Sequence, residues 1–253
     1  MFILQNYNNS LLYNMSDTCL VFKNFYDYDP VLKIPDNLPT NMTPVYITDS
    51  SSNISIATSL GWQCFYVDTF KNITDPFQMR LTIAYINCYV EKVVPELLKY
   101  KYIFICDSNV VKLDSNYTDF INKRNINKAL YLTSGWYRGH NNTMERELQR
   151  SLRNIRWRYN FDQMIHATNR YMTELWKLNI DIHDTPVVSA KYIGWNISHP
   201  NKELLADYVY EEYKKHLQGN IIFSFILKLY PEYIEHYTDF KNDGAVIDHV
   251  YKR

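Results

Sequence analysis

Short apolar runs and longer helical patterns alternate along the first 130 residues of the chain. Each apolar run is bounded by polar residues, Gly or Pro, which is typical of buried strands. The runs predicted as strands are 45–48, 63–67, 102–106 and 128–133. The segments with helical spacing are 54–60, 78–99 and 116–123, and Pro95 is expected to break the second one near its end. Alternating strands and helices predict an α/β fold with a mostly parallel sheet and right-handed crossovers.

The second half of the chain is predicted to be mainly helical. Helical periodicity covers 144–177, 202–218 and 221–229, and the one predicted strand is 186–192. Residues 1–43 are punctuated by prolines and are expected to form an irregular arm that contains a short strand at 20–22. The residues from 233 onward are polar and are expected to be loosely held. We therefore divide the chain into an N-terminal arm (1–43), a globular domain (44–232) and a C-terminal tail (233–253).

Composition narrows the class of protein. Lys plus Arg and Asp plus Glu number 27 each, so no overall charge favours nucleic acid or an anionic membrane. No apolar stretch approaches the roughly 18 residues of a membrane span, and the first 14 residues lack the features of a signal peptide. Cys64 and Cys106 lie within apolar runs, which favours buried free thiols over disulfides. We therefore expect a cytoplasmic protein without a membrane span.

Acidic residues follow three of the predicted strands. Asp49, Asp68 and Asp107 stand where these strands end, and the last is followed by Ser108 and Asn109. Ligands bind at the carboxyl ends of strands in open α/β sheets, and Mg²⁺ binds carboxylates together with phosphate oxygens. The segment Asp107–Asn109 therefore predicts a cation holding a diphosphate, or else a polar turn that only closes a core strand. The sequence contains neither GxGxxG nor the P-loop pattern.

A longer series of residues resembles a known family. In order, the series is Tyr46-Ile47-Thr48-Asp49, Gly61-Trp62, Arg80, Lys92-Val93-Val94-Pro95 and Tyr102 to Asp107. It resembles the glycosyltransferase-like family of plant Golgi proteins implicated in mucilage pectin synthesis, which also has bacterial and viral members. The resemblance covers roughly residues 44 to 230. It implies a GT-A-type, Rossmann-like nucleotide-sugar fold with a mostly parallel central sheet flanked by helices.

The resemblance also implies roles for individual residues. Thr48 and Asp49 would lie near the nucleobase and ribose. Arg80 and Lys92 would lie near the donor, with Arg80 the better candidate for a diphosphate contact. Asp107 and Asn109 would take the place of the Asp-x-Asp motif that holds Mn²⁺ or Mg²⁺, with Ser108 between them. The chain departs from the family in two places. Asn109 is a neutral ligand where the family has a carboxylate, and Gly219-Asn220 stand where the family carries Asp-Gln.

The base that would activate an acceptor has weaker candidates. Asp162 and Glu211 are the residues we assign to this role, with Asp184 also considered. Asp162 lies in an amphipathic helical pattern and is equally a surface charge. Glu211 lies near Lys214 and Lys215, where ordinary pairing along a helix explains it.

Two further segments carry candidate ligand-binding groups. Trp136 and His140 lie in a loop after a predicted strand, where an aromatic face could stack on a sugar, and a plain Gly-containing loop is the alternative. His199 follows the segment Gly194-Trp195-Asn196, where GT-A folds often place a late metal or sugar contact, so we include it among the metal candidates.

The sequence thus predicts a glycosyltransferase that moves a sugar from a UDP- or GDP-sugar to a glycan or glycoprotein acceptor. A catalytically inactive nucleotide-sugar or glycan-binding module is the alternative, based on Asn109 and Gly219-Asn220. A hydrolase is disfavoured because the chain has no nucleophile elbow and no HExxH-like spacing. The arginines of 146–158 are diluted by acidic residues, which disfavours nucleic-acid binding.

Overall fold

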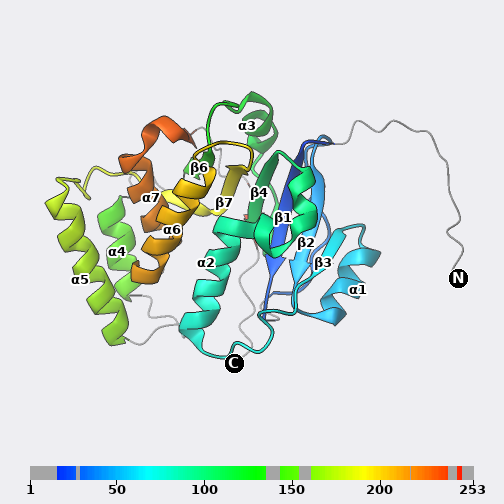
Figure 1. The fold of residues 1–253 in the computed structure, drawn as a ribbon, viewed down its shortest axis with the longest axis horizontal. Helices are drawn as coiled ribbons and strands as arrows, with labels where there is room; N and C mark the ends of the chain where they lie inside the picture. Colours follow the sequence, from blue (N-terminus) through cyan, green and yellow to red (C-terminus); the bar gives the residue numbers. More distant parts are fainter. Residues whose placement is uncertain are drawn as a thin grey trace, which may run out of the picture.

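The computed structural model describes residues 16–26, 29–134, 143–153, 161–216, 218–238 and 244–246. Its main sheet has seven strands in the order β3-β2-β1-β4-β7-β6-β8 (Figure 1). The strands of this sheet are β1 (Thr18–Asn24), β2 (Thr43–Thr48), β3 (Gln63–Tyr66), β4 (Tyr102–Asp107), β6 (Leu130–Ser134), β7 (Val188–Asn196) and β8 (Ile234–Tyr237). All neighbours pair in parallel except β7, which is antiparallel to β4 and β6. The expected mostly parallel α/β fold is confirmed.

Helices cover both faces of this sheet (Figure 1). They are α1 (Ser51–Ser59), α2 (Pro76–Val93), α3 (Tyr117–Lys123), α4 (Met144–Arg153), α5 (Phe161–Lys177), α6 (Lys202–His216) and α7 (Gly219–Leu229), with 3₁₀ turns at Pro95–Lys99 and Pro231–Tyr233. Apolar residues of α2, α6 and α7 form one core with the sheet, and those of α1 and α3 form the other. Within the described residues, no helix is both long and apolar enough to cross a membrane.

The side chains of each strand alternate between these two cores. In β4, Ile103 and Ile105 face the α2 core, and Phe104 and Cys106 face the α3 core. Alternation is the rule for a pleated strand, and hydrophobic residues at every position are the mark of a strand buried on both faces. It also means that Asp107, two residues after Ile105, lies on the α2 side of the sheet.

The helix α2 has clear start and stop signals. The Asp75 carboxylate accepts a hydrogen bond from the Gln78 amide at 2.8 Å, and Pro76 occupies the first turn. Tyr89 has a non-helical backbone (φ −139°, ψ 41°), and the chain leaves the helix before Pro95. The predicted helix 78–99 is therefore an α-helix followed by a short 3₁₀ turn, with the break where Pro95 predicts it.

Both ends of the chain differ from expectation. β1, part of the predicted arm, is buried at every position and lies between β2 and β4 in the middle of the sheet. β8, part of the predicted loose tail, pairs in parallel with β6, and a two-residue strand, β9 (Ala245–Val246), pairs with β5 (Val110–Lys112). The boundaries at 43 and 233 are therefore not boundaries of the sheet. The short strand expected at 20–22 is present and extends over Thr18–Asn24, whereas β8 lies in a polar segment where no strand was expected.

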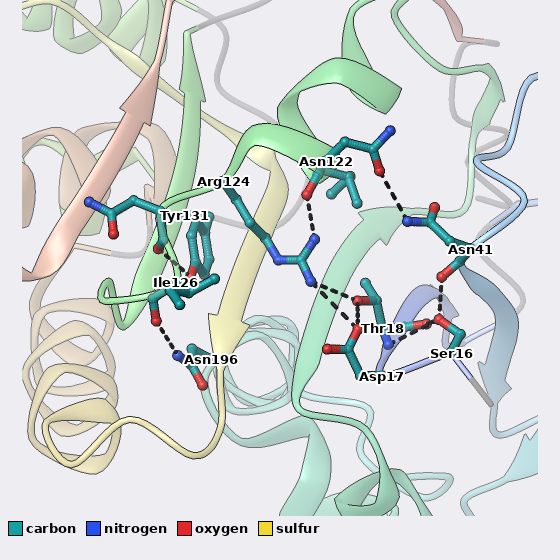
Figure 2. A network of polar contacts seen from close by, with 11 residues as sticks. Ser16, Asp17, Thr18, Asn41, Asn122, Arg124, Ile126, Tyr131 and Asn196 are labelled. Atoms are coloured by element: carbon teal, nitrogen blue, oxygen red, sulfur yellow. Dashed lines mark hydrogen bonds and ion pairs between the residues drawn. The ribbon is translucent and has the colours of Figure 1, made fainter. Parts of the chain in front are cut away.

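A polar cluster around Arg124 joins the amino ends of β1 and β4 (Figure 2). Its guanidinium donates to the Ile121 carbonyl and, at 3.1 Å, to the Thr18 hydroxyl, and lies 3.5 Å from the Asp17 carboxylate. The guanidinium carbon also lies 3.9 Å from the centre of the Tyr102 ring, a cation–π contact. Arg124 thereby connects the end of α3 to two strands at the amino edge of the sheet.

Candidate functional site

The carboxyl edge of the sheet gathers most of the residues that the sequence singles out. β1, β2, β3 and β4 run in parallel and so end at this edge, where β7, being antiparallel, begins. The register pairs Lys23 with Asp107 and Asn24 with Thr48. Extending the β4–β7 register by one residue beyond Cys106 and Tyr192 brings Lys191 opposite Asp107. This edge is where α/β sheets bind ligands.

Lys23 and Asp107 form an ion pair at the centre of this edge. The Lys23 ammonium nitrogen lies 2.7 Å from a carboxylate oxygen of Asp107, and the two side chains are 4% and 31% exposed. Both residues continue the strand positions that face the α2 core, after Val21 and Ile105. No pattern in the sequence singled out Lys23 as a site residue. The one signal it carries is its position two residues after Val21, a buried residue of an apolar run.

Other charges surround this pair. Burial raises the pKa of the Cys106 thiol, Asp107 raises it further, and both Lys23 and Lys191 oppose that shift. Burial likewise raises the pKa of the Tyr213 hydroxyl on α6, and Arg80 opposes it. Arg80 lies near the start of α2, so its charge acts on the same side of the sheet as Asp107. A cationic environment for an anionic group therefore exists on this face.

Thr48, Asp49 and Ser108 have defined partners at the strand ends. The Asp49 carboxylate accepts from the Tyr26 amide at 3.0 and 3.2 Å, where Tyr26 has a positive φ of 63°. The Ser108 hydroxyl donates to the buried Asp29 carboxylate at 2.5 Å. The Thr48 hydroxyl accepts from the Ser50 amide at 3.2 Å, and Asn109 is buried. In this structure these residues shape the loops that border the site.

Lys92 and His199 lie at the opposite edge, which corrects their predicted place beside the donor. Lys92 is twelve residues after Arg80 on α2, about 18 Å along a helix, and pairs with Glu203 of α6 at 2.5 Å. His199 follows the end of β7, where its ring nitrogen accepts from the Asn201 amide at 3.1 Å and its ring lies 6.3 Å from that of Tyr233. His199 therefore cannot share a metal ion with Asp107 in this arrangement.

The candidate bases are not brought to the site either. Asp162 is an exposed residue in the first turn of α5. Glu211 is 57% exposed on α6, and Lys214 donates to it at 2.5 Å, which is the ordinary pairing considered as its alternative. Trp136 and His140 lie outside the described residues.

A network of side-chain hydrogen bonds lies beside the site, at the start of α7. The Asn220 amide nitrogen donates to Glu147 of α4 at 3.1 Å, and its oxygen accepts from the Ala190 amide of β7 at 2.8 Å. Glu147 is a buried carboxylate with a 6% exposed side chain. The Gly219-Asn220 pair, noted as a departure from the family, thus fixes α4 and α7 against the start of β7. This pairing joins residues 73 and 30 positions apart, so the sequence held no local signal for it.

The fold is similar to that of solved glycosyltransferase structures. Mouse xyloside xylosyltransferase 1 in its apo form aligns with a TM-score of 0.50 and 8% identity, over 87% of this chain and 83% of that chain. The apo structure of the bifunctional glycosyltransferase WbbM aligns with a TM-score of 0.50 and 9% identity, over 90% of this chain and 40% of that chain. The fold is of the GT-A type. At such low identity the likeness concerns the fold alone.

Comparisons of the sequence with protein-family models and with curated proteins give no match. The GT-A-like fold therefore rests on the structure, and the role of each residue rests on its own contacts.

The GT-A-like fold raises the question of a divalent cation at Asp107. An Mg²⁺ or Mn²⁺ site needs several oxygen ligands that converge on one point. Here an Asp107 oxygen is 2.7 Å from an ammonium group, Asn109 is buried, and His199 is at the other edge. No group of three or more His, Cys, Asp or Glu side chains within the described ranges could hold a metal ion. The predicted ligand set of Asp107, Asn109 and His199 does not fit a cation.

Proposed function

We propose that this chain is a glycosyltransferase that moves a sugar from a nucleoside-diphosphate sugar to a glycan or glycoprotein acceptor. The observation that carries the proposal is the placement of Asp107 with Lys23, Lys191 and Arg80 at the carboxyl edge of a GT-A-like sheet. Membership of the plant Golgi mucilage family is part of the proposal and is supported by the series from Tyr46 to Asp107.

The chemistry of glycosyl transfer fits this placement. The leaving nucleoside diphosphate carries negative charge, which fixed cations aimed at the site stabilise without reorganisation. Arg80 and Lys191 lie on the same side of the sheet as Asp107, and a carboxylate at a strand end can accept hydrogen bonds from hydroxyl groups of the donor. The site therefore offers both a place for the diphosphate and an acceptor for sugar or ribose hydroxyls.

Calorimetric titration of the full chain with a panel of UDP- and GDP-sugars tests this function. We expect at least one donor to bind, and Asp107→Ala to weaken its binding by about tenfold or more. Asp36→Ala serves as the control, because Asp36 is an exposed carboxylate paired with Lys33 away from this edge. Thermal melting of both variants separates lost binding from lost folding. Failure of the whole panel to bind wild type contradicts the function, and unchanged binding by Asp107→Ala contradicts the site.

The second candidate function is a nucleotide-sugar-binding module without transferase activity. It is favoured by the positions of Asp162 and Glu211, neither of which the structure brings to Asp107. Release of free nucleoside diphosphate, with and without a broad set of glycan acceptors, distinguishes the two functions. A transferase releases it in the presence of an acceptor, whereas a binding module holds the donor unchanged.

A further inference from the structure

Lys23 is held in place by the architecture of the sheet. The parallel register of β1 and β4 sets Lys23 directly beside Asp107, and strand alternation turns both side chains toward the α2 core. The resulting N–O distance of 2.7 Å is that of a charge-assisted hydrogen bond. The lysine side chain is 4% exposed, so water does not screen it as it does a surface lysine. An ammonium group buried this far requires a paired carboxylate to remain charged.

The same chain contains a second buried lysine pair that is useful for comparison. Lys202 of α6 is 2% exposed and donates to the Glu91 carboxylate, which is 6% exposed, and to the Cys88 carbonyl at 3.1 Å. This pair lies between α2 and α6 near the amino edge, and a weaker contact at 3.4 Å joins the lysine to the exposed Glu203. The Lys23 pair differs because its carboxylate is 31% exposed and therefore opens toward the candidate site.

A divalent cation and Lys23 compete for the same carboxylate. A cation bound to Asp107 would lie next to a buried ammonium group of like charge, and the two would repel each other. Lys23, Lys191 and Arg80 supply positive charge on this face of the sheet. Fixed cations of this kind can neutralise a diphosphate in place of a metal ion.

We propose that Lys23 replaces the divalent cation at Asp107, so that the chain binds a nucleoside diphosphate without a metal. This inference rests on the proposed function, because it concerns the same donor site. Lys23 acts as a positioning residue: its ammonium group holds the Asp107 carboxylate in place at the strand end and adds positive potential behind the diphosphate. Asp107 accordingly serves as a hydrogen-bond acceptor and not as a metal ligand.

The first test compares metal-free and metal-loaded conditions with the wild-type chain. UDP and GDP are titrated calorimetrically in excess EDTA and again in Mn²⁺. We expect dissociation constants that agree within about twofold, because no metal takes part. Binding that is about tenfold weaker in EDTA overturns this inference and leaves the proposed function standing. Absence of binding in both conditions overturns both.

The second test uses variants matched for burial and charge. Lys23→Met removes the ammonium beside Asp107, and Lys202→Met removes the other buried ammonium at the amino edge. In EDTA, we expect Lys23→Met to weaken nucleotide binding by about tenfold or more, and Lys202→Met to change it by less than about twofold. Adding Mn²⁺ should then strengthen binding by Lys23→Met, since Asp107 is released for a cation, and should not strengthen binding by wild type.

Lys23→Arg keeps the positive charge, so we expect it to bind nucleotide in EDTA. This variant distinguishes loss of the charge from loss of folding in Lys23→Met. Circular dichroism melting of each variant is recorded alongside. The assignment is overturned if Lys23→Met weakens nucleotide binding no more than Lys202→Met does. It is also overturned if Mn²⁺ strengthens binding by the wild-type chain as much as binding by Lys23→Met.

Discussion

At the scale of single residues, the start of α7 depends on a glycine. A Cβ at Gly219 would lie 2.5 Å from the Tyr213 hydroxyl and 2.8 Å from the Ala190 Cβ. Ala190 is the residue whose amide donates to Asn220, and its neighbour Lys191 faces the site. The glycine therefore allows α6, α7 and β7 to approach one another beside the donor site. A glycine is needed here because a side chain would not fit, and not because of the backbone conformation, which has no positive φ.

Gly219→Ala is expected to lower both stability and nucleotide binding. The new methyl group would push the Tyr213 hydroxyl and the Ala190 side chain away from α7, and this overpacked contact costs about 1–3 kcal/mol of unfolding free energy. The shift of β7 should weaken UDP or GDP binding by roughly threefold to tenfold. Urea denaturation and calorimetry measure the two effects.

Gly61→Ala is the control for this prediction. A Cβ at Gly61 meets only Ile34 Cδ1 at 3.7 Å, but the backbone has φ +89° and costs about 1 kcal/mol for a residue with a side chain. Stability should fall while nucleotide binding stays unchanged. If Gly219→Ala behaves in the same way, the close approach at α7 does not shape the site.

The residue scale also shows what the sequence can predict of the site. Asp107 was predictable because an apolar run followed by an acidic residue marks a strand end wherever it occurs. Lys23 was not, because its partner is 84 residues away and only the pairing of β1 with β4 joins them. Lys92 was placed near the donor by the resemblance alone, and the length of α2 puts it about 18 Å from Arg80 along the helix.

At the scale of elements, β8 shows why an edge strand escapes prediction. Its sequence is Ile-Glu-His-Tyr, and only Ile234 is buried, so neither an apolar run nor a clean alternation marks it. By contrast, β2, β3 and β4 carry clear apolar runs and were predicted to within two residues, although β3 also lies at a sheet edge. An edge strand is stabilised by its ladder to one neighbour, here β6, and that information is not local in sequence.

His236 of β8 makes this strand sensitive to pH. Burial lowers the pKa of His236 from 6.5, and its Nε2 lies 3.3 Å from the Ser134 hydroxyl of β6. As pH falls below 6.5, the unfolded chain takes up a proton that the folded chain resists, so the folded state loses stability until the folded pKa is reached. We expect His236→Gln to remove part of the fall in urea midpoint between about pH 7 and pH 5.

His183 provides the opposite sign as a control. A hydrogen bond from its ring to Glu145, at 2.9 Å, raises the pKa of His183 above 6.5. Its pairing stabilises the fold below the unfolded pKa, and that stabilisation is lost as pH rises through the folded pKa. His183→Gln should therefore steepen the loss of stability in acid only slightly, because this side chain is 67% exposed. A pH profile unaltered by His236→Gln contradicts the role of His236.

At the scale of the whole molecule, different sets of charged residues lie at the two edges of the sheet. The amino edge holds the Arg124 cluster, the Lys202–Glu91 pair and the Lys92–Glu203 pair. The carboxyl edge holds Lys23, Lys191 and Asp107, and Arg80 near the start of α2 acts on the same face. Such a division follows from a parallel sheet, which sets all strand ends of one kind together and leaves the other edge for structural contacts.

The helix α2 joins the two edges and therefore allows the division to be tested within one element. Arg80→Met removes a cation near the carboxyl edge and should weaken UDP or GDP binding by about tenfold, the effect of losing one charged hydrogen bond. Lys92→Met removes a cation about 18 Å away along the helix and should leave binding within about twofold of wild type. Stability should change little in Lys92→Met, because its pair with Glu203 is 47% and 56% exposed and such surface pairs contribute about 0–1 kcal/mol. Calorimetry and thermal melting of both variants check these outcomes. Equal losses of binding, or a loss confined to Lys92→Met, would contradict the site at Asp107.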